Sequence, residues 1–260
     1  MTEARTEKEI EIMRDGGVLL SRALSEVVKA VAPGITMIEL DQLAERLLRD
    51  GGGEPSFKGY RSRHGEVPFP STVCISVNNE VVHGPGSRAV ALREGDLAGF
   101  DIGVWFQGLC TDMAVTVPVG KVKSEAQQLT QATRQALVAG LTAVRDSASV
   151  SDIGRAIEEF VKPYGYGIVR DLVGHGVGKK VHEDPHIPNY HDHRYDKVKL
   201  KTGQTIAIEP MLTLGDWRVK TLSDGWTIVT ADGSLAAHFE VTVLVTENGY
   251  ELITPFIESV

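Results

Sequence analysis

Apolar residues in the first fifty positions recur at the spacing of amphipathic helices. From about residue 6 to residue 32 they return every three or four positions, behind the capping box Thr6-x-x-Glu9. A second run, from about Thr36 to Arg49, begins with the box Thr36-x-x-Glu39. The pattern therefore predicts two helices. Their apolar stripes are Ile10, Met13, Leu20, Leu24, Val27 and Val31 in the first and Leu40, Leu43 and Leu47 in the second.

Short apolar runs follow these helices and are typical of β-strands. The first four are Thr72–Val77, Glu80–His83, Leu97–Trp105 and Asp112–Val117. Two more helices are then predicted, from Ser124 to about Val144 and from Ser149 to Pro163, each opened by a capping pattern. Strand-like runs come last: Ile168–Val173, Thr205–Ile208, Arg218–Leu222, Thr227–Val229 and Phe239–Val245, with a turn at Ser223-Asp224-Gly225.

The order of two helices and then strands occurs twice along the chain, and four local features recur in the same order in both halves. The pairs are Thr6 with Ser124, Thr36 with Ser149, His83-Gly84 with His175-Gly176, and Asp101 with Glu209. Such recurrence predicts a single α+β domain over residues 1–260, built from two pseudo-twofold halves of about residues 1–120 and 121–260. Chance recurrence of turn and strand patterns is the alternative.

Composition argues against several classes of protein. The 260 residues carry a formal net charge of -8 without a basic block, so a nucleic-acid surface is not expected. There is no stretch of about 18 uncharged apolar residues, and the polar first residues do not resemble a signal peptide. The two cysteines, Cys74 and Cys110, are too few for a disulfide framework and favour a reducing cytoplasm.

Asp101 and Asp112 lie in two apolar runs that are predicted to form the arms of one hairpin. With a turn centred between residues 106 and 107, these two aspartates would face each other across the pair. Opposed like charges destabilise a sheet, so one carboxyl group would take a proton or a cation would lie between them. Two aspartates that point into water at strand ends are the alternative.

A glycine-rich segment carries two histidines. Gly174-His175-Gly176-Val177-Gly178 follows an apolar run, and His182 comes seven residues after His175. Three glycines in five residues let the backbone approach a neighbouring group closely. The two imidazoles can converge across this turn, although a histidine with a purely structural role remains the alternative.

Two glutamates complete the candidate cluster. Glu209 ends the strand-like run Thr205–Ile208, and Glu240 lies in the run Phe239–Val245. Taken alone, Glu240 is typical of the exposed face of an edge strand. Taken with Asp101, Asp112 and His175, these carboxylates suit one or two divalent ions such as Mn, Fe(II), Co or Zn.

Together these residues and their spacing resemble the type I methionine aminopeptidases, which have the pita-bread fold. The resemblance covers essentially the whole chain. It rests on Val82-His83-Gly84, Asp101 with Asp112, Gly174-His175-Gly176-Val177-Gly178 with His182-Glu183-x-Pro185, Glu209-Pro210-Met211, and Glu240. The long insertion of type II enzymes and the zinc modules of eukaryotic type I enzymes are absent, which favours the short bacterial form.

The resemblance implies a role for each residue. Five side chains would hold two divalent ions (Co, Mn, Fe(II) or Zn), with Asp112 and Glu240 bridging: Asp101, Asp112, His175, Glu209 and Glu240. Glu209 would move the proton of a bridging hydroxide, His182 would contact the scissile amide, and His83 would bind the substrate backbone. The methionine pocket would be lined by Cys74, Phe69 and Trp226.

The resemblance also implies a biological setting. The protein would remove the initiator methionine from nascent polypeptide N-termini, with a small second residue preferred, as a cytoplasmic monomer without nucleic-acid or membrane dependence. Action at the ribosome is left open. The family usually has an aromatic residue at the position of Val181 and a more compact segment at 59–70.

Two other readings fit part of the pattern. A prolidase or Xaa-Pro aminopeptidase shares the fold, and Asp101-Ile102-Gly103 would suit it, but such proteins generally carry a separate N-terminal domain. A non-catalytic peptide-binding relative would have lost metal ligands, whereas this chain has all five.

Overall fold

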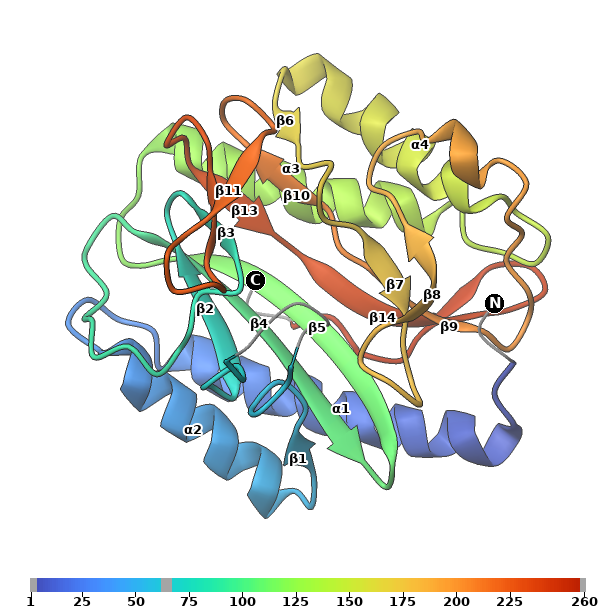
Figure 1. The fold of residues 1–260 in the computed structure, drawn as a ribbon, viewed down its shortest axis with the longest axis horizontal. Helices are drawn as coiled ribbons and strands as arrows, with labels where there is room; N and C mark the ends of the chain where they lie inside the picture. The colour runs from blue at the N-terminus through green and yellow to red at the C-terminus, as the bar shows by residue number, and fades with distance from the viewer. Residues whose placement is uncertain (1–3, 62–66, 258–260) are drawn as a thin grey trace.

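A computed structural model describes residues 4–61 and 67–257. Its centre is a nine-stranded sheet. Seven of these strands are neighbours in the order β1, β4, β5, β14, β9, β7 and β8. Helices α1 and α2 run along one side of the view in Figure 1, and α3 and α4 run along the opposite side. Two smaller three-stranded sheets join β13, β10 and β6, and β11, β12 and β3.

Four α-helices occupy the described residues, close to their predicted positions. They are α1 (Glu7–Lys29), α2 (Met37–Asp50), α3 (Ser124–Leu141) and α4 (Val150–Val161), with short 3-10 helices at Lys162–Tyr164 and His193–Tyr195. The capping boxes at Thr6 and Thr36 are confirmed, and the Asp152 carboxylate accepts a hydrogen bond from the Ser149 backbone N–H at 2.9 Å. The predicted cap at Ser124 is wrong, because Lys123 occupies that position without a side-chain hydrogen bond.

The strands are short except for one central hairpin. In the first half they are β1 (Glu54–Pro55), β2 (Val73–Val77), β3 (Glu80–Val82), β4 (Leu97–Phe106) and β5 (Leu109–Pro118). In the second half they are β6 (Gly167–Ile168), β7 (Gly174–Gly176), β8 (Glu183–Ile187), β9 (Thr205–Ile208), β10 (Met211–Thr213), β11 (Val219–Thr221), β12 (Ile228–Thr230), β13 (Ala236–His238), β14 (Glu240–Val245) and β15 (Tyr250–Leu252).

One strand prediction is mostly wrong. The run Ile168–Val173 forms a strand only at Ile168, and the next strand is the glycine-rich β7 at Gly174–Gly176. β7 pairs with β8 on one side and β9 on the other, so its neighbours hold an extended segment whose own composition does not favour a strand.

The strand order explains the internal repeat. The central four strands are ordered β4-β5-β14-β9, and β5 pairs with β14 antiparallel. Each half therefore contributes one inner and one outer strand. Asp101 lies on the outer strand β4, and Glu209 directly follows the other outer strand, β9. The pseudo-twofold relation predicted from the sequence thus places these two carboxylates at corresponding points of the sheet.

Strand alternation separates the core from the functional face. On β4, Phe100 and Ile102 are fully buried in the main apolar cluster, which also contains Leu20 and Leu24 of α1. Burying a side chain of this size contributes roughly 1.5–3 kcal/mol. Because successive strand residues point to opposite faces, Asp101 is directed away from this cluster. The helices thus hold one face of the sheet and leave the other free for polar chemistry.

Candidate metal centre and active site

Four carboxylates and three imidazoles line one cavity of about 270 Å³ on the face of the sheet away from the helical core. They come from both halves of the chain. The residues are Asp101, Asp112, Glu209 and Glu240, with His83, His175 and His182. Every residue that the sequence analysis proposed as a ligand or catalytic group therefore lies in the wall of the same cavity.

The hairpin of β4 and β5 was predicted, but its register was wrong by two residues. Phe106 pairs with Leu109, so the turn residues are Gln107 and Gly108, and Asp101 lies opposite Ala114 rather than Asp112. Asp112 is therefore the diagonal neighbour of Asp101 on the same face. Diagonal neighbours still lie within reach of each other, so the like-charge problem persists in this register.

Ala114 is the centre of the carboxylate cluster. It pairs with Asp101 of β4 on one side and with Glu240 of β14 on the other, and Asp112 lies two residues before it on β5. The methyl group of Ala114 leaves open the space that a larger side chain would fill. The sheet therefore surrounds one small residue with three carboxylates, a feature that the sequence analysis did not identify.

His175 enters the cluster from β7, where it pairs with Ala207 of β9. Its Nδ1 lies 2.9 Å from the backbone oxygen of Gly176, and its Nε2 lies 3.5 Å from Glu209 Oε1. The carbonyl accepts a hydrogen bond from Nδ1–H, which leaves the lone pair of Nε2 directed toward the carboxylates. This is the arrangement in which a neutral histidine serves as a metal ligand.

Burial perturbs the acidic groups strongly. Desolvation raises the pKa of Asp101 to about 7, and it raises the pKa of Asp112, Glu209 and Glu240 well above their ordinary values. Repulsion from neighbouring carboxylates adds to desolvation for Asp112, Glu209 and Glu240. Carboxylates gathered without counter-charge therefore hold protons or require cations.

Buried carboxylate oxygen atoms without hydrogen-bond partners are a second indication of a cation site. Asp101 Oδ1, Asp112 Oδ1 and Glu240 Oε1 are buried, and they have no hydrogen-bond partner among the described residues. Buried polar atoms are nearly always paired in folded proteins, so this cluster calls for a ligand. Oxygen donors with one imidazole match the donor set that divalent transition-metal ions accept. The residues present fit a metal centre.

Two further histidines lie beside this centre and stay neutral near pH 7. Burial lowers the pKa of His83 to about 4, and desolvation also lowers the pKa of His182. The His182 ring lies 4.5 Å from the His175 ring, centroid to centroid, while part of its side chain is exposed at the cavity rim. Neutral imidazoles can each donate one hydrogen bond and accept another.

Tyr60 was not identified as a site residue from the sequence. Its hydroxyl oxygen lies 2.9 Å from His182 Nδ1, and its ring packs edge-on against the His182 ring. Tyr60 belongs to the segment at 59–70 that differs from the family pattern, and residues 62–66 of that segment lie outside the described residues. The signal available in the sequence was only an aromatic residue beside a glycine.

His238 was also missed. Its Nε2 is buried without a hydrogen-bond partner among the described residues, and it lies 3.8 Å from Glu209 Oε2 and 3.9 Å from Glu240 Oε2. Burial lowers its pKa to about 3. His238 precedes Glu240 by two residues, so strand periodicity could have placed both side chains on one face.

Comparison with known proteins decides the family. Residues 11–247 match metallopeptidase family M24. The chain belongs to this family. A methionine aminopeptidase of Clostridium perfringens is 43% identical over 251 residues, covering 96% of this chain and 97% of that protein. Methionine aminopeptidase 1 of Bacillus subtilis is 42% identical over 255 residues, covering 98% and 99% respectively.

Solved M24 structures agree with the sequence matches. Methionine aminopeptidase from Thermotoga maritima has a TM-score of 0.92 at 40% identity, covering 98% of this chain and all of that one (100%). Prolidase from Pyrococcus furiosus has a TM-score of 0.77 at 23% identity, and 65% of that chain is covered. The prolidase match shows the shared fold alone. The predicted resemblance to bacterial type I methionine aminopeptidases and their pita-bread fold is confirmed.

The apolar part of this M24 cavity lies next to its carboxylates. The three residues predicted to line a methionine pocket, Cys74, Phe69 and Trp226, all border the cavity, and the Phe69 and Trp226 rings meet edge to face at 5.2 Å. Cys74 pairs with Asp101 across β2 and β4, which joins the apolar wall to the acidic one. Phe57, which was not predicted as a site residue, borders the same cavity.

Proposed function

We propose that this M24 enzyme removes the N-terminal methionine from polypeptides with two divalent cations held by Asp101, Asp112, His175, Glu209 and Glu240. The single observation that carries the proposal is the buried group of carboxylate oxygens without partners around Ala114. Asp112 and Glu240 come from the two inner strands, β5 and β14, and would be the ligands that both cations share. The number and the type of cation are part of this proposal.

Bound there, divalent cations would polarise the scissile carbonyl and lower the pKa of water. The side chains of this chain would move the proton and stabilise the developing negative charge. Glu209 lies in the wall of the same cavity, where its carboxylate can accept a proton from the attacking water and pass it to the leaving amine. Neutral His182, steadied by Tyr60, donates to the carbonyl oxygen as negative charge develops on it.

Methionine specificity follows from the mixed character of the cavity. An unbranched thioether side chain fits an apolar wall of two aromatic rings and a thiol, Phe69, Trp226 and Cys74. The pKa of the Cys74 thiol is raised well above its usual value by burial and by Asp101 and Asp112, so this wall stays uncharged. His83 borders the same cavity, where its neutral imidazole can donate to the substrate backbone.

A proline-specific peptidase is the second candidate, because solved prolidases share the fold. The relatives with about 40% identity over nearly the full length are named methionine aminopeptidases, which favours methionine removal. Nascent chains in the cytoplasm are the proposed substrates, acted on by a monomer. Among the described residues, no helix has the length and apolar character needed to cross a membrane.

Cleavage of two peptides separates the candidates. The purified enzyme loaded with Mn(II) is expected to release methionine from Met-Ala-Ser and to leave an Ala-Pro peptide intact. Removal of the cations by a chelator should abolish the release, and added Mn(II) should restore it. Faster cleavage of the Ala-Pro peptide would establish the proline-specific alternative instead.

A further inference from the structure

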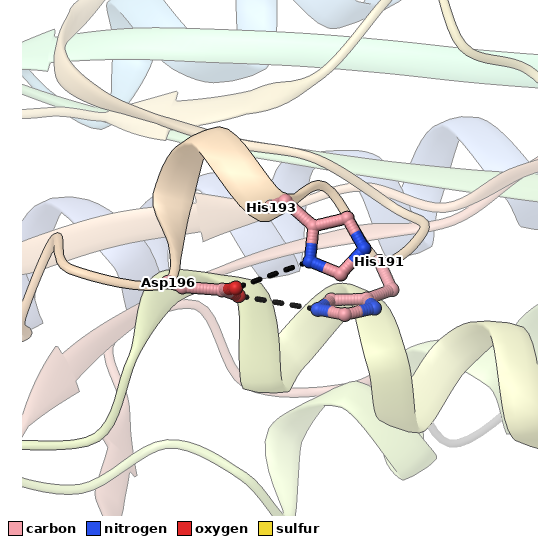
Figure 2. A group of neighbouring side chains, drawn as sticks. All are labelled: His191, His193 and Asp196. Carbon is pink, nitrogen blue, oxygen red and sulfur yellow. Dashed lines mark hydrogen bonds and ion pairs between the residues drawn. The ribbon is translucent and has the colours of Figure 1, made fainter.

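The loop between β8 and β9 carries a polar cluster that takes no part in the catalytic cavity. It consists of His191, His193 and Asp196. Figure 2 shows both imidazoles turned toward the Asp196 carboxylate. His191 Nε2 lies 3.1 Å from Asp196 Oδ1, and His193 Nδ1 lies 3.2 Å from Asp196 Oδ2.

We propose that His191, His193 and Asp196 form a second metal site, which binds a divalent transition-metal ion such as Zn²⁺ within this loop, beside the start of α4. Two imidazoles and one carboxylate are typical ligands of zinc and of its neighbours in the first transition row. None of the three residues borders the catalytic cavity. The proposed site is therefore separate from the centre that performs hydrolysis.

The spacing of the donor atoms suits such an ion. Metal–ligand bonds of about 2.0–2.1 Å place neighbouring donors about 2.9–3.4 Å apart around a tetrahedral or octahedral ion. The two nitrogen–oxygen separations of 3.1 and 3.2 Å lie within that interval. One ligand atom from each of the three residues lies within 4.8 Å of the others. The His193 side chain is 84% exposed, so it can rotate and bring its ligand nitrogen closer to the ligand atoms of His191 and Asp196.

Hydrogen-bond chemistry gives an independent reason for a cation. His191 Nε2 lies 3.1 Å from Arg155 Nη2 and also 3.1 Å from Asp196 Oδ1. A guanidinium can only donate and a carboxylate can only accept, so one ring nitrogen cannot satisfy both neighbours. An ion held by Nε2 and Asp196 would take the place of Arg155 Nη2, which also lies 4.0 Å from Asp196 Oδ1. Arg155 keeps a partner in that case, because its Nη1 donates to Asp152 Oδ1 at 2.9 Å.

The carboxylate is held in place by the first turn of α4. Ser151 Oγ donates to Asp196 Oδ1 at 2.7 Å, and Ser149 Oγ donates to the Asp196 backbone oxygen at 2.7 Å. The Ser151 hydroxyl and the two imidazoles lower the pKa of Asp196, which favours the ionised carboxylate. Groups of this kind around a ligand orient it and raise affinity by about 10–100-fold. The site is thus supported by a rigid helix rather than by the loop alone.

Metal counting tests the proposal. The intact enzyme is loaded with excess Zn²⁺, dialysed, and its zinc content is measured per chain, for the native protein and for His193→Ala and Asp196→Asn. Each variant is expected to bind one zinc ion fewer than the native protein, with its rate on Met-Ala-Ser unchanged under Mn(II). The control is His186→Ala, which removes an exposed histidine of β8 outside the cluster and is expected to leave the zinc content unchanged.

A local readout separates this site from the catalytic centre. The imidazole nitrogen resonances of His191 and His193 are expected to shift as one equivalent of Zn²⁺ binds, and those shifts should be lost in Asp196→Asn. Equal zinc content in the native protein and both cluster variants would overturn the proposal. Zinc binding should also be measured for Arg155→Gln. If this variant binds zinc at the cluster and the native protein does not, the proposal is overturned, because the Arg155 guanidinium is then the cation that the cluster holds in the native protein.

Discussion

Asp101 of β4 and Glu240 of β14 both pair with the same residue, Ala114 of β5, from the two strands that flank it. One comes from each half of the chain. Directly paired residues share a face of the sheet, so the Ala114 methyl group lies on the same face as both carboxylates. The space that the cations need therefore depends on a residue that is not itself a ligand.

Replacement of Ala114 should therefore weaken cation binding without removing any ligand. Ala114→Val adds two methyl groups between Asp101 and Glu240, and a β-branched residue is well tolerated in a strand. We expect the affinity for Mn(II) to fall about 10–100-fold, as when groups around a metal site are disturbed. Calorimetric titration of the apoprotein checks this. Ala114→Gly, which adds no volume, is the matched control, and equal losses in both variants would contradict the steric explanation.

Two other substitutions should separate cation binding from catalysis. His182→Ala is expected to lower kcat by on the order of 100-fold or more while cation content stays normal, because His182 is proposed to donate to the substrate and is not among the proposed ligands. Asp112→Asn is expected to lose both cation content and rate. Rate assays paired with metal analysis check both variants, and cation loss in His182→Ala would show that its role is assigned wrongly.

The pKa of Asp101 predicts how pH acts on the apoprotein. Its folded pKa, about 7, exceeds the value of an exposed aspartate, so the folded state holds the proton more tightly than the unfolded state does. The stabilisation is fully present below the unfolded pKa, about 4, and is lost as pH rises through about 7. We expect the melting temperature of the chelated protein to fall between pH 5 and pH 8. The cation-loaded protein should show a smaller fall, and equal falls would contradict the assignment.

Arg5 fastens the N-terminal segment to the loop that carries His182. Its side chain is 1% exposed, and it donates to Glu183 Oε2 at 2.7 Å and to the Val177 backbone oxygen at 3.0 Å. Arg5→Ala leaves Glu183 without this partner, which costs roughly 3–5 kcal/mol in buried pairs. We expect a lower free energy of unfolding and a lower kcat, measured by denaturant titration and peptide assay. Arg5→Lys should recover only part of both, because lysine lacks the forked donors.

Substrate choice should depend on the second residue. A bulky side chain there would push the scissile carbonyl away from the cations and from His182, and a displacement of about 1 Å can cost on the order of 100-fold in rate. We expect Met-Ala and Met-Thr peptides to be cleaved and Met-Leu to be resistant in competition assays. Comparable rates on Met-Leu would show that the rule is relaxed here.

Local patterns predicted the helices and most strands because capping boxes and apolar periodicity are encoded within a few residues. Pairing was harder to predict. The β4–β5 register was missed because Gln107 and Gly108 both adopt positive φ, 47° and 85°, as a two-residue hairpin turn requires, and glutamine does not signal this. The glycine-rich β7 is held extended by β8 and β9, which only the assembled sheet reveals.

The site residues also divide into those indicated by local sequence patterns and those indicated only by contacts in the folded chain. The carboxylates could be predicted because each lies in or at the end of an apolar strand, and His175 because it lies in a glycine-rich turn with a second histidine nearby. Tyr60 could not, because its relevance comes from the contact of its hydroxyl with His182 in the folded chain. For His238, periodicity could indicate the face it shares with Glu240, but its approach to Glu209 depends on the folded chain. The small size of Ala114 acquires meaning only once the strand order is known.

The most direct test of the two-cation centre is an anomalous diffraction map of crystals loaded with Mn(II) and soaked with methionine. We predict two peaks about 3.5–4 Å apart in the catalytic cavity. Both peaks should contact Asp112 and Glu240, and the methionine side chain should lie against Phe69 and Trp226. A single peak in this cavity, or two peaks that share neither Asp112 nor Glu240, would contradict the account.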